Sequence, residues 1–538
     1  MSKTQTSFGR EAKDKLKNGI KIVNDAVSTT MGPFGRNVLY VDEYGSPKST
    51  KDGVSVAKMI NELEDPIENL GAQIIKQAAI KTVDQAGDGT TTSTVLAYSI
   101  STQALDAASY PGINVTELKR GIENTSTLII SELQKQSKKI ESSDQLKQIA
   151  TLSANGDKEI GDLVTEALDK VGRDGVVTVE ESRSGENSLE TVEGIQFDRG
   201  YKSPYFVTDN NSMQSILNDT LILIYDKRIN NMKDILPILN SVSTQNKSLL
   251  IIAEDIADEA LSVLIVNKMR GILKVCAVKA PDFGDRRTLV LEDIAILTGG
   301  KVVSPDKGMK LDKFNQDWFG EARIVTVGRD TTTIVDGKGE DEQIKQRVTE
   351  LKNQLDNTQS NYEREKLQER LAKMIGGVAI INVGGGNELE IKERKDRVDD
   401  ALNATKAALE EGILQGSGVA LLDAVSEVSS RTIGNVSKDY LLGREIIFKA
   451  CKVPFIQILS NANIEPHEWI NKVGGNGVLN ISEGILVNAH NSGIIDPTKV
   501  VRCALQNAVA ASTTLLLTEC VIYNKKEDKK EDLSESFA

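Results

Sequence analysis

The chain has 538 residues, of which 39% are hydrophobic and 27% are charged, a composition typical of a globular protein with several domains. Its formal net charge of −13 and the lack of a long basic block argue against nucleic acid as the main partner. No run of about 18 apolar residues occurs, so we expect no membrane-spanning helix.

The cysteines and histidines are too few and too scattered for a zinc finger or a Cys/His hydrolase. The four cysteines form no C-x-x-C pair, and the histidines number two. We therefore expect reduced, mostly buried thiols. Residues 1–17 are polar and charged, unlike a signal or transit peptide. These features predict a cytoplasmic protein and are also compatible with an organelle-encoded origin.

The N-terminal part of the chain, residues 11–136, is predicted to be mostly helical. Residues 90–108 carry apolar side chains at helical spacing. Asn114 followed by Glu117 is typical of a helix start, because a short polar side chain can cap the first free N–H groups.

The middle of the chain has an α/β pattern. Short apolar runs at residues 176–179 and 221–225 predict strands. Residues 249–252, 257–270 and 273–278 read as strand, helix and strand, with the length of a β-α-β crossover.

The charged segment 341–374 is predicted to be a surface helical hairpin that breaks at residues 356–360. Residues 392–425 are expected to return to helix, followed by helices and glycine-rich turns up to about residue 523. The charged tail, residues 526–538, is expected to be disordered. Helical ends flanking an α/β middle indicate a domain inserted into another one.

The strongest local signal is the run Gly87-Asp88-Gly89-Thr90-Thr91-Thr92, directly before a predicted helix. Glycines let the backbone approach a phosphate, and the N–H groups of a helix start attract anions. Asp88 is the candidate ligand for Mg²⁺. An ordinary capped turn would have a similar composition. The sequence contains no Walker A motif, which excludes the usual P-loop NTPases.

Seven ordered segments together resemble the group I chaperonins, from about residue 8 to residue 523. The segments are TMGPFGRNV at 30–38, TKDGV at 50–54, GDGTTT at 87–92, FDRGY at 197–201, KAPDFGDRR at 279–287, RVDDAL at 397–402 and DPTKV at 496–500.

This resemblance implies a multidomain α and α/β fold. A mostly helical equatorial domain that binds ATP would comprise residues 1–136 and 411–525. A small intermediate hinge domain would comprise 137–192 and 378–410. The inserted α/β apical domain, residues 193–377, would bind substrate proteins and a cochaperonin.

The resemblance also implies roles for individual residues in binding ATP and Mg²⁺, with K⁺ as a further possible ion. Asp400 would orient the attacking water, with Asp52 as a second acidic group. Asp496 would contact the ribose and Asn480 would lie near the base. The contacts to the phosphates and the metal would come from Thr30, Met31, Gly32, Pro33, Lys51, Asp88, Gly89, Thr90, Thr91 and Thr92. Ser417 stands in Gly416-Ser417-Gly418, where the family commonly has a third glycine.

Apolar residues of the middle region are the candidates for a groove that binds non-native proteins. They are Tyr201, Tyr205, Phe206, Leu236, Leu239, Leu261, Ile265 and Val266. Considered without the resemblance, the helical members of this set would be assigned to the core.

The implied function is ATP-dependent protein folding. Non-native polypeptides would be encapsulated in a homo-oligomer of two stacked seven-membered rings, closed by a GroES-type cochaperonin. Two alternatives remain open. One is a small-molecule phosphotransferase with a compact pocket near Asp400. The other is a holdase that binds proteins without a productive ATP cycle.

Overall fold

The computed structural model describes residues 4–41, 45, 47–60, 62–154, 156–172, 175–182, 185–192, 194–210, 212–358, 360–375, 377–432, 434–475 and 477–524. It divides into two compact units. The terminal unit comprises residues 1–165 and 396–538, and the inserted unit comprises residues 166–395. Both ends of the chain therefore belong to one unit, as the sequence pattern predicted. The finer division into three domains stays a prediction, and the predicted disordered tail lies outside the described residues.

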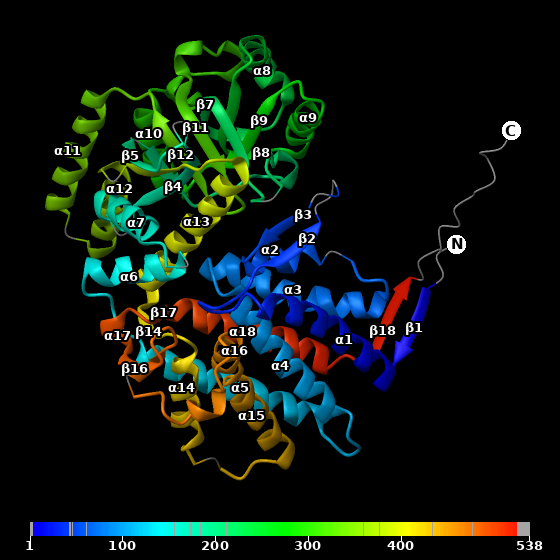
Figure 1. Ribbon diagram of the computed structural model, residues 1–538. Coiled ribbons are helices and arrows are strands. Elements are labelled where there is room, and N and C mark those ends of the chain that lie inside the picture. Colours follow the sequence, from blue (N-terminus) through cyan, green and yellow to red (C-terminus); the bar gives the residue numbers. More distant parts are fainter. Residues whose placement is uncertain are drawn as a thin grey trace. The chain divides into compact units, whose positions relative to one another are not determined.

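The terminal unit is built on long helices that share one apolar core. Figure 1 shows these helices packed side by side. They are α1 (Gly9–Ser28), α3 (Pro66–Ala86), α4 (Thr90–Ala108), α5 (Val115–Gln136), α15 (Lys438–Ala450) and α18 (Thr498–Leu516).

The helix predictions for the N-terminal part are confirmed. Helix α4 has the predicted bounds. Helix α5 begins after Asn114, whose side chain accepts hydrogen bonds from the N–H groups of Thr116 and Glu117. A capped start of this kind stabilises a helix by about 1 kcal/mol.

The predicted return to helix over residues 392–425 is confirmed for most of this range, as two helices with a break between them. Helix α13 (Glu388–Glu411) ends before Gly412, which has a φ of 84°. A short strand, β14 (Ile413–Gln415), and a turn at Gly416–Gly418 separate it from α14 (Val419–Ser429). The glycines adopt left-handed backbone conformations that end one helix and start the next.

Short strand pairs complete the terminal unit. Strands β1 (Thr4–Phe8) and β18 (Cys520–Asn524) run antiparallel and join the two ends of the described chain (Figure 1). The other pairs are β2 (Val38–Val41) with β3 (Pro47–Thr50), β14 with β17 (Ile495–Pro497), and β15 (Gly477–Asn480) with β16 (Ile485–Asn488). The remaining helices are α2 (Gly53–Met59), α6 (Ser143–Ser153), α16 (Val453–Asn461), α17 (Ala489–Ser492) and η5 (Pro466–Glu468). Helix α7 (Lys158–Val171) spans the boundary of the two units.

The inserted unit is built around a mixed sheet with the strand order β6-β12-β11-β7-β8-β9. Strands β7, β8 and β9 are parallel, and their central residues are completely buried, as expected for parallel strands covered on both faces. The strands are β6 (Gly194–Phe197), β7 (Ser215–Ile229), β8 (Ser248–Ile256), β9 (Lys274–Lys279), β10 (Val302–Val303), β11 (Gly320–Val327) and β12 (Thr332–Gly337). A separate small sheet has the order β4-β13-β5, with β4 (Val176–Glu181), β5 (Ser188–Val192) and β13 (Val378–Val383).

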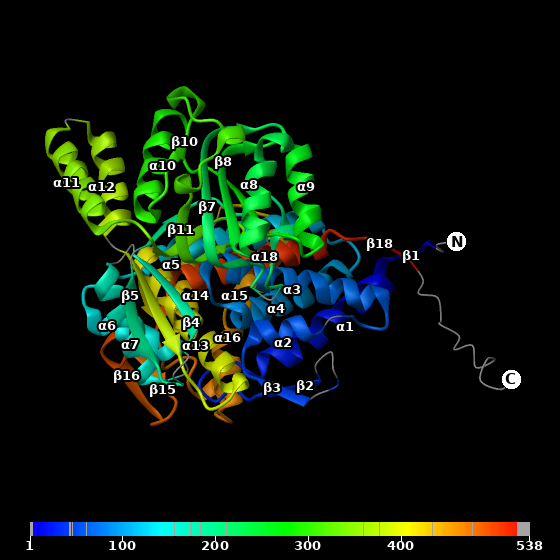
Figure 2. The same cartoon turned by 90° about the horizontal axis from the view of Figure 1, so that it is seen from above.

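The predicted β-α-β crossover is confirmed as β8, α9 (Asp258–Met269) and β9. Helix α8 (Met232–Gln245) makes the preceding crossover, and Figure 2 shows α8 and α9 side by side next to β7 and β8. The unit also contains α10 (Gly284–Thr298) and the short helices η1 (Pro204–Phe206), η2 (Pro305–Lys307), η3 (Leu311–Lys313) and η4 (Gln316–Trp318).

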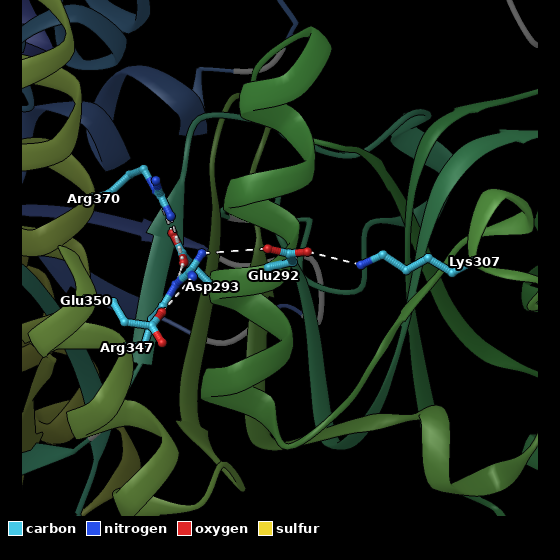
Figure 3. Close-up of polar contacts among 6 residues, drawn as sticks. All are labelled: Glu292, Asp293, Lys307, Arg347, Glu350 and Arg370. Atoms are coloured by element: carbon cyan, nitrogen blue, oxygen red, sulfur yellow. Dashed lines mark hydrogen bonds and ion pairs between the residues drawn. The ribbon is translucent and has the colours of Figure 1, made fainter. Parts of the chain in front are cut away.

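The predicted helical hairpin is also confirmed, as α11 (Asp341–Asn357) and α12 (Asn361–Ile375). A buried carboxylate on α10 attaches both helices to the unit (Figure 3). Asp293, which is 2% exposed, accepts hydrogen bonds from Arg347 of α11 at 2.9 Å and from Arg370 of α12 at 2.7 Å. Its neighbour Glu292 forms ion pairs with Lys307 at 3.1 Å and with Arg347 at 3.7 Å.

None of the described helices is long and apolar enough to cross a membrane. Cys276, Cys451, Cys503 and Cys520 are all free, and all but Cys520 are buried, in agreement with the expected thiols.

Replacing Asp293 should destabilise the inserted unit strongly. Asp293→Ala leaves two largely buried guanidinium groups without their shared carboxylate, which should cost about 3 kcal/mol or more. Trp318 lies in this unit and Trp469 in the other, so urea unfolding followed by Trp318 fluorescence in a Trp469→Phe background reports on the inserted unit.

The matched control is Glu350→Ala. Glu350 binds the same arginine, Arg347, at 3.1 Å, but its side chain is 47% exposed, so its loss should cost at most about 1 kcal/mol. Equal destabilisation by the two substitutions would contradict the role assigned to Asp293.

Candidate functional site

The loop between α3 and α4 has the backbone geometry of an anion site. Gly87 and Gly89 have φ values of 75° and 97°, which L-residues with side chains rarely adopt. Gly89 precedes α4 without a side-chain cap, so the first N–H groups of the helix have no capping oxygen from that residue. An approaching anion can accept hydrogen bonds from these groups.

Close packing holds this loop against two other segments. A Cβ atom on Gly87 would lie 2.3 Å from the Cβ of Asn403, so α13 touches the loop backbone. A Cβ atom on Gly53 would lie 2.4 Å from Oγ1 of Thr91, so the start of α2 touches the start of α4. No larger residue fits at either glycine without displacing its neighbour. The α3–α4 loop carries Asp88, the start of α2 carries Asp52, and α13 carries Asp400.

These carboxylates are close enough to affect each other's ionisation. Burial raises the pKa of Asp400 well above its usual value, and the charges of Asp88 and Asp52 raise it further. Burial and the charge of Asp52 raise the pKa of Asp88. Burial and the charge of Asp88 raise the pKa of Asp496 to about 7, although the N–H group of Gly418 donates to it. The site therefore has an excess of negative charge that a cation would neutralise.

Asp52 has a second, structural contact. Its side chain caps α2 by accepting hydrogen bonds from the N–H groups of Val54 at 3.0 Å and Ser55 at 2.8 Å. This cap fixes the orientation of the carboxylate.

Hydroxyl groups and one lysine supply donors in the same region. Thr90 Oγ1 and Ser93 Oγ are buried, and neither has a hydrogen-bond partner among the described residues. Burial lowers the pKa of Lys51, which has no ion pair within the described part of the chain. Buried polar groups normally have partners, so these groups indicate that a polar ligand belongs here.

The turn at residues 30–33 lies on another side of the same region. Gly32 has a φ of 81°, and the side-chain amide of Asn461 donates to the carbonyl oxygen of Met31 at 2.9 Å. Met31 belongs to an apolar cluster that contains Val95 of α4 and Val419 of α14. The cluster therefore holds the turn close to α4 and to the Gly416–Gly418 turn.

Ser417 keeps the left-handed backbone that a glycine would adopt there, with a φ of 57°. Such a conformation costs about 1 kcal/mol for a residue with a side chain. Strand β14 pairs with β17, and this register places Leu414 opposite Asp496. Asn480 ends β15, and its side chain accepts a hydrogen bond from the N–H of Ser482.

No group of three or more His, Cys, Asp or Glu side chains among the described residues could enclose a metal ion alone. A cation here would therefore need oxygen atoms from a ligand in addition to those of one or two carboxylates.

The structure separates the predicted client-binding residues into exposed and buried ones. Tyr205, Leu236 and Val266 are exposed, whereas Tyr201, Leu261 and Ile265 pack partly against the core. Phe206 and Leu239 are buried in the core, with 0% and 4% exposure, so the prediction that they line an exposed groove is wrong for this conformation. Both side chains belong to the apolar core of the inserted unit.

The exposed apolar residues at the C-terminal end of α9 were not predicted. Met269 is 66% exposed and Ile272 is 53% exposed, at the end of α9 and just beyond it. Met269 follows Val266 by three positions, so both lie on the same face of the helix. The spacing was visible in the sequence. Ser93 was also missed, although it follows Thr90 at the same spacing.

Comparisons with known proteins show the family and the fold. Residues 23–526 match the TCP-1/cpn60 chaperonin family. Among solved structures, the chain is similar to the chaperonin gp146 from the bacteriophage EL 2 (Pseudomonas aeruginosa), determined in the presence of ATP-BeFx. The TM-score is 0.70 at 24% identity, and the match covers 97% of this chain and 99% of that one.

The raised pKa of Asp496 predicts a pH-dependent stability. Between its ordinary pKa of 3.8 and about 7, the folded state retains a proton that the unfolded state has lost. Stability should therefore fall as pH rises through this window. Asp496→Asn removes the effect, so the Tm of the variant relative to the unsubstituted protein should increase from about pH 5 to about pH 8.

Calorimetry without nucleotide would measure both Tm values. Asp84→Asn, which removes an exposed carboxylate from α3, is the charge-matched control. A Tm difference for Asp496→Asn that does not change with pH would refute the prediction.

Proposed function

This chain belongs to the TCP-1/cpn60 chaperonin family, and we propose that it is an ATP-hydrolysing chaperone that encloses non-native proteins and releases them folded. The observation that carries the ATP-dependent part is the grouping of Asp52, Asp88 and Asp400 around an uncapped, glycine-flanked helix start. A cation would offset the mutual repulsion of the carboxylates, and a phosphate would accept hydrogen bonds from the free N–H groups. The site therefore suits a ligand that contains both.

Magnesium-bound ATP fits the donor set. Mg²⁺ is usually held by one or two carboxylates together with substrate phosphates. The lack of a self-sufficient metal cluster in the described residues agrees with this mode. The unpartnered hydroxyl groups of Thr90 and Ser93 would gain acceptors from phosphate oxygens. The similar phage chaperonin was determined with an ATP analogue, which supports the same ligand class here.

We assign the nucleotide contacts as follows. Asp88 would hold Mg²⁺, which when bound supplies positive charge to the phosphate oxygens. Lys51 would neutralise phosphate charge. Asp496 would accept from the ribose and Asn480 would face the base. The phosphates would accept hydrogen bonds from the turn at residues 30–33 and from Gly89, Thr90, Thr91 and Thr92.

Asp400 would perform the proton transfer. Its pKa is raised toward neutral pH, and a general base is most effective when its pKa lies near the working pH. It orients the attacking water and takes a proton from it. Asp52, oriented by its cap on α2, lies close enough for its carboxylate to contribute to the raised pKa of Asp400.

The client-binding surface would be the apolar surface of η1, α8 and α9, formed by Tyr205, Leu236, Val266, Met269 and Ile272. Exposed apolar side chains of this number on neighbouring elements mark interaction sites, because water contact is unfavourable for them. These side chains can contact apolar segments of a client protein whatever its sequence.

The assembly would be a closed ring of identical subunits, which we propose forms two stacked seven-membered rings with a GroES-type lid. The alternatives are a single ring and a ring that works without a lid. They are distinguished by measuring the mass of the particle and by comparing refolding with and without cochaperonin.

Asp400→Ala should abolish productive folding while keeping nucleotide binding. We expect ATP hydrolysis to fall about 100-fold or more, the usual effect of losing a general base. Refolding of a chemically denatured, aggregation-prone enzyme, assayed with ATP and cochaperonin, should fall in parallel.

The control for that experiment is Glu393→Gln, which removes an exposed charge two turns earlier on the same helix. Suppression of aggregation without any ATP-dependent recovery by the unsubstituted protein would indicate a holdase. Phosphorylation of a small molecule in place of refolding would indicate a phosphotransferase.

Val266→Ser should weaken client capture and leave ATP hydrolysis intact. Val266 is 43% exposed, so the substitution changes the surface more than the core. Co-sedimentation with a denatured protein would measure capture. Ile375→Ser, at an exposed apolar residue at the end of α12, is the control. Equal loss of capture by both variants would contradict a specific client surface.

A further inference from the structure

The carboxylate of Asp423, on α14, links two segments that the proposed nucleotide site depends on. It accepts a hydrogen bond from the side-chain amide of Gln415 at 3.1 Å. It also accepts one from the backbone N–H of Gly475. A Cβ atom on Gly474 would lie 2.5 Å from Oδ1 of Asp423, so the carboxylate packs directly on the glycine backbone.

The first of these segments leads into the Gly416–Gly418 turn. Gln415 is the last residue of β14, directly before Gly416. Gly416 donates its N–H to Ile494 at 2.9 Å, and Gly418 donates its N–H to Asp496. The position of Gln415 therefore affects the backbone that supports Asp496.

The second segment is the base of the β15–β16 hairpin. Gly474 and Gly477 exchange backbone hydrogen bonds at 2.9 and 3.0 Å and so close the turn that precedes β15. Asn480 lies at the other end of β15. The hairpin is short, so the anchoring of its base to α14 also limits the movement of Asn480.

We propose that Asp423 is a positioning residue that holds the Asn480 hairpin in register with the Gly416–Gly418 turn and thereby sets the selectivity for the base of the nucleotide. This inference depends on the proposed nucleotide site. Asp423 takes no part in the reaction itself, because its contacts are Gln415 and the glycine turn. Its partial burial makes the two hydrogen bonds effective, since an amide left unpaired in such a place is unfavourable.

The contacts predict which kinetic constants change. Asp52 caps α2, Asp88 lies in the α3–α4 loop, and Asp400 lies on α13. In the part of the chain that the structure describes, the hydrogen bonds of Asp423 go to Gln415 and Gly475 instead. Loss of the Asp423 carboxylate should therefore loosen the base side of the site and leave the hydrolytic side in place. A lower affinity with little change in kcat is the signature of lost ground-state binding.

The experiment compares Asp423→Ala with Asp423→Asn in the full-length, assembled protein. For Asp423→Ala we expect a rise of about tenfold in the KM for ATP, a similar fall in the preference for ATP over GTP in kcat/KM, and a kcat within about threefold. Asp423→Asn should recover most of both losses, because its amide can accept from Gly475 and donate to Oε1 of Gln415.

A second variant and a control keep the test decisive. Gln415→Met removes one of the two hydrogen bonds and keeps the carboxylate, so it should shift KM and base preference in the same direction by a smaller factor. Glu427→Ala is the control, because Glu427 lines the same cavity of about 540 Å³ but pairs with Arg431. It should leave both readouts unchanged.

The outcomes separate this inference from the proposed function. If the unsubstituted protein neither binds nor hydrolyses ATP, the nucleotide site is wrong and the inference fails with it. If ATP hydrolysis is normal and Asp423→Ala changes neither KM nor the preference for ATP over GTP, only the inference fails. A loss of kcat alone, not rescued by Asp423→Asn, would show a general structural role and would also overturn it.

Discussion

The candidate site depends on close contact between helix α13 and the α3–α4 loop, at a position where the loop residue is a glycine. Helix α13 can touch the α3–α4 loop because Gly87 leaves no Cβ in the way of Asn403. Burial of Asp400 raises its pKa, and the charges of the nearby Asp88 and Asp52 raise it further. The electrostatic properties of the site thus follow from a packing constraint. A bound cation would relieve the repulsion that the packing creates, so ligand binding and stability of the site are coupled.

Much of the fold could be predicted from the sequence, because local signals were strong. Apolar spacing gave the bounds of α4, the Asn114 cap gave the start of α5, and unbroken apolar strands gave the parallel part of the sheet. Apolar periodicity did not show the break between α13 and α14, because the apolar pattern continues across Gly412 and Gly416–Gly418. The left-handed backbone at those positions is a tertiary requirement, which periodicity does not register.

The site was predictable in its parts and less so in its assembly. Gly87–Thr92 suggests phosphate binding by composition alone, but Asp400 is an ordinary helical carboxylate until α13 is packed on the loop. The apolar surface of the inserted unit shows the opposite limitation. A helix such as α9 carries more apolar residues than one buried face needs, and sequence alone does not tell which of them face the core. Exposure separates Val266 and Met269 from the buried Leu264.

The pairing of β1 with β18 has a consequence for how the polypeptide is made. The inserted unit is a continuous stretch of chain, so it has all its partners soon after it leaves the ribosome. The terminal unit lacks α15, α18 and β18 until residues 438–524 have been synthesised, and the apolar helix faces of residues 1–165 stay uncovered until then. Domains generally fold as units during synthesis, from the N-terminus onward. In this topology the inserted unit can fold before the terminal unit is complete. During synthesis the chain therefore exposes apolar helix faces, as do the non-native proteins that such a chaperone would bind.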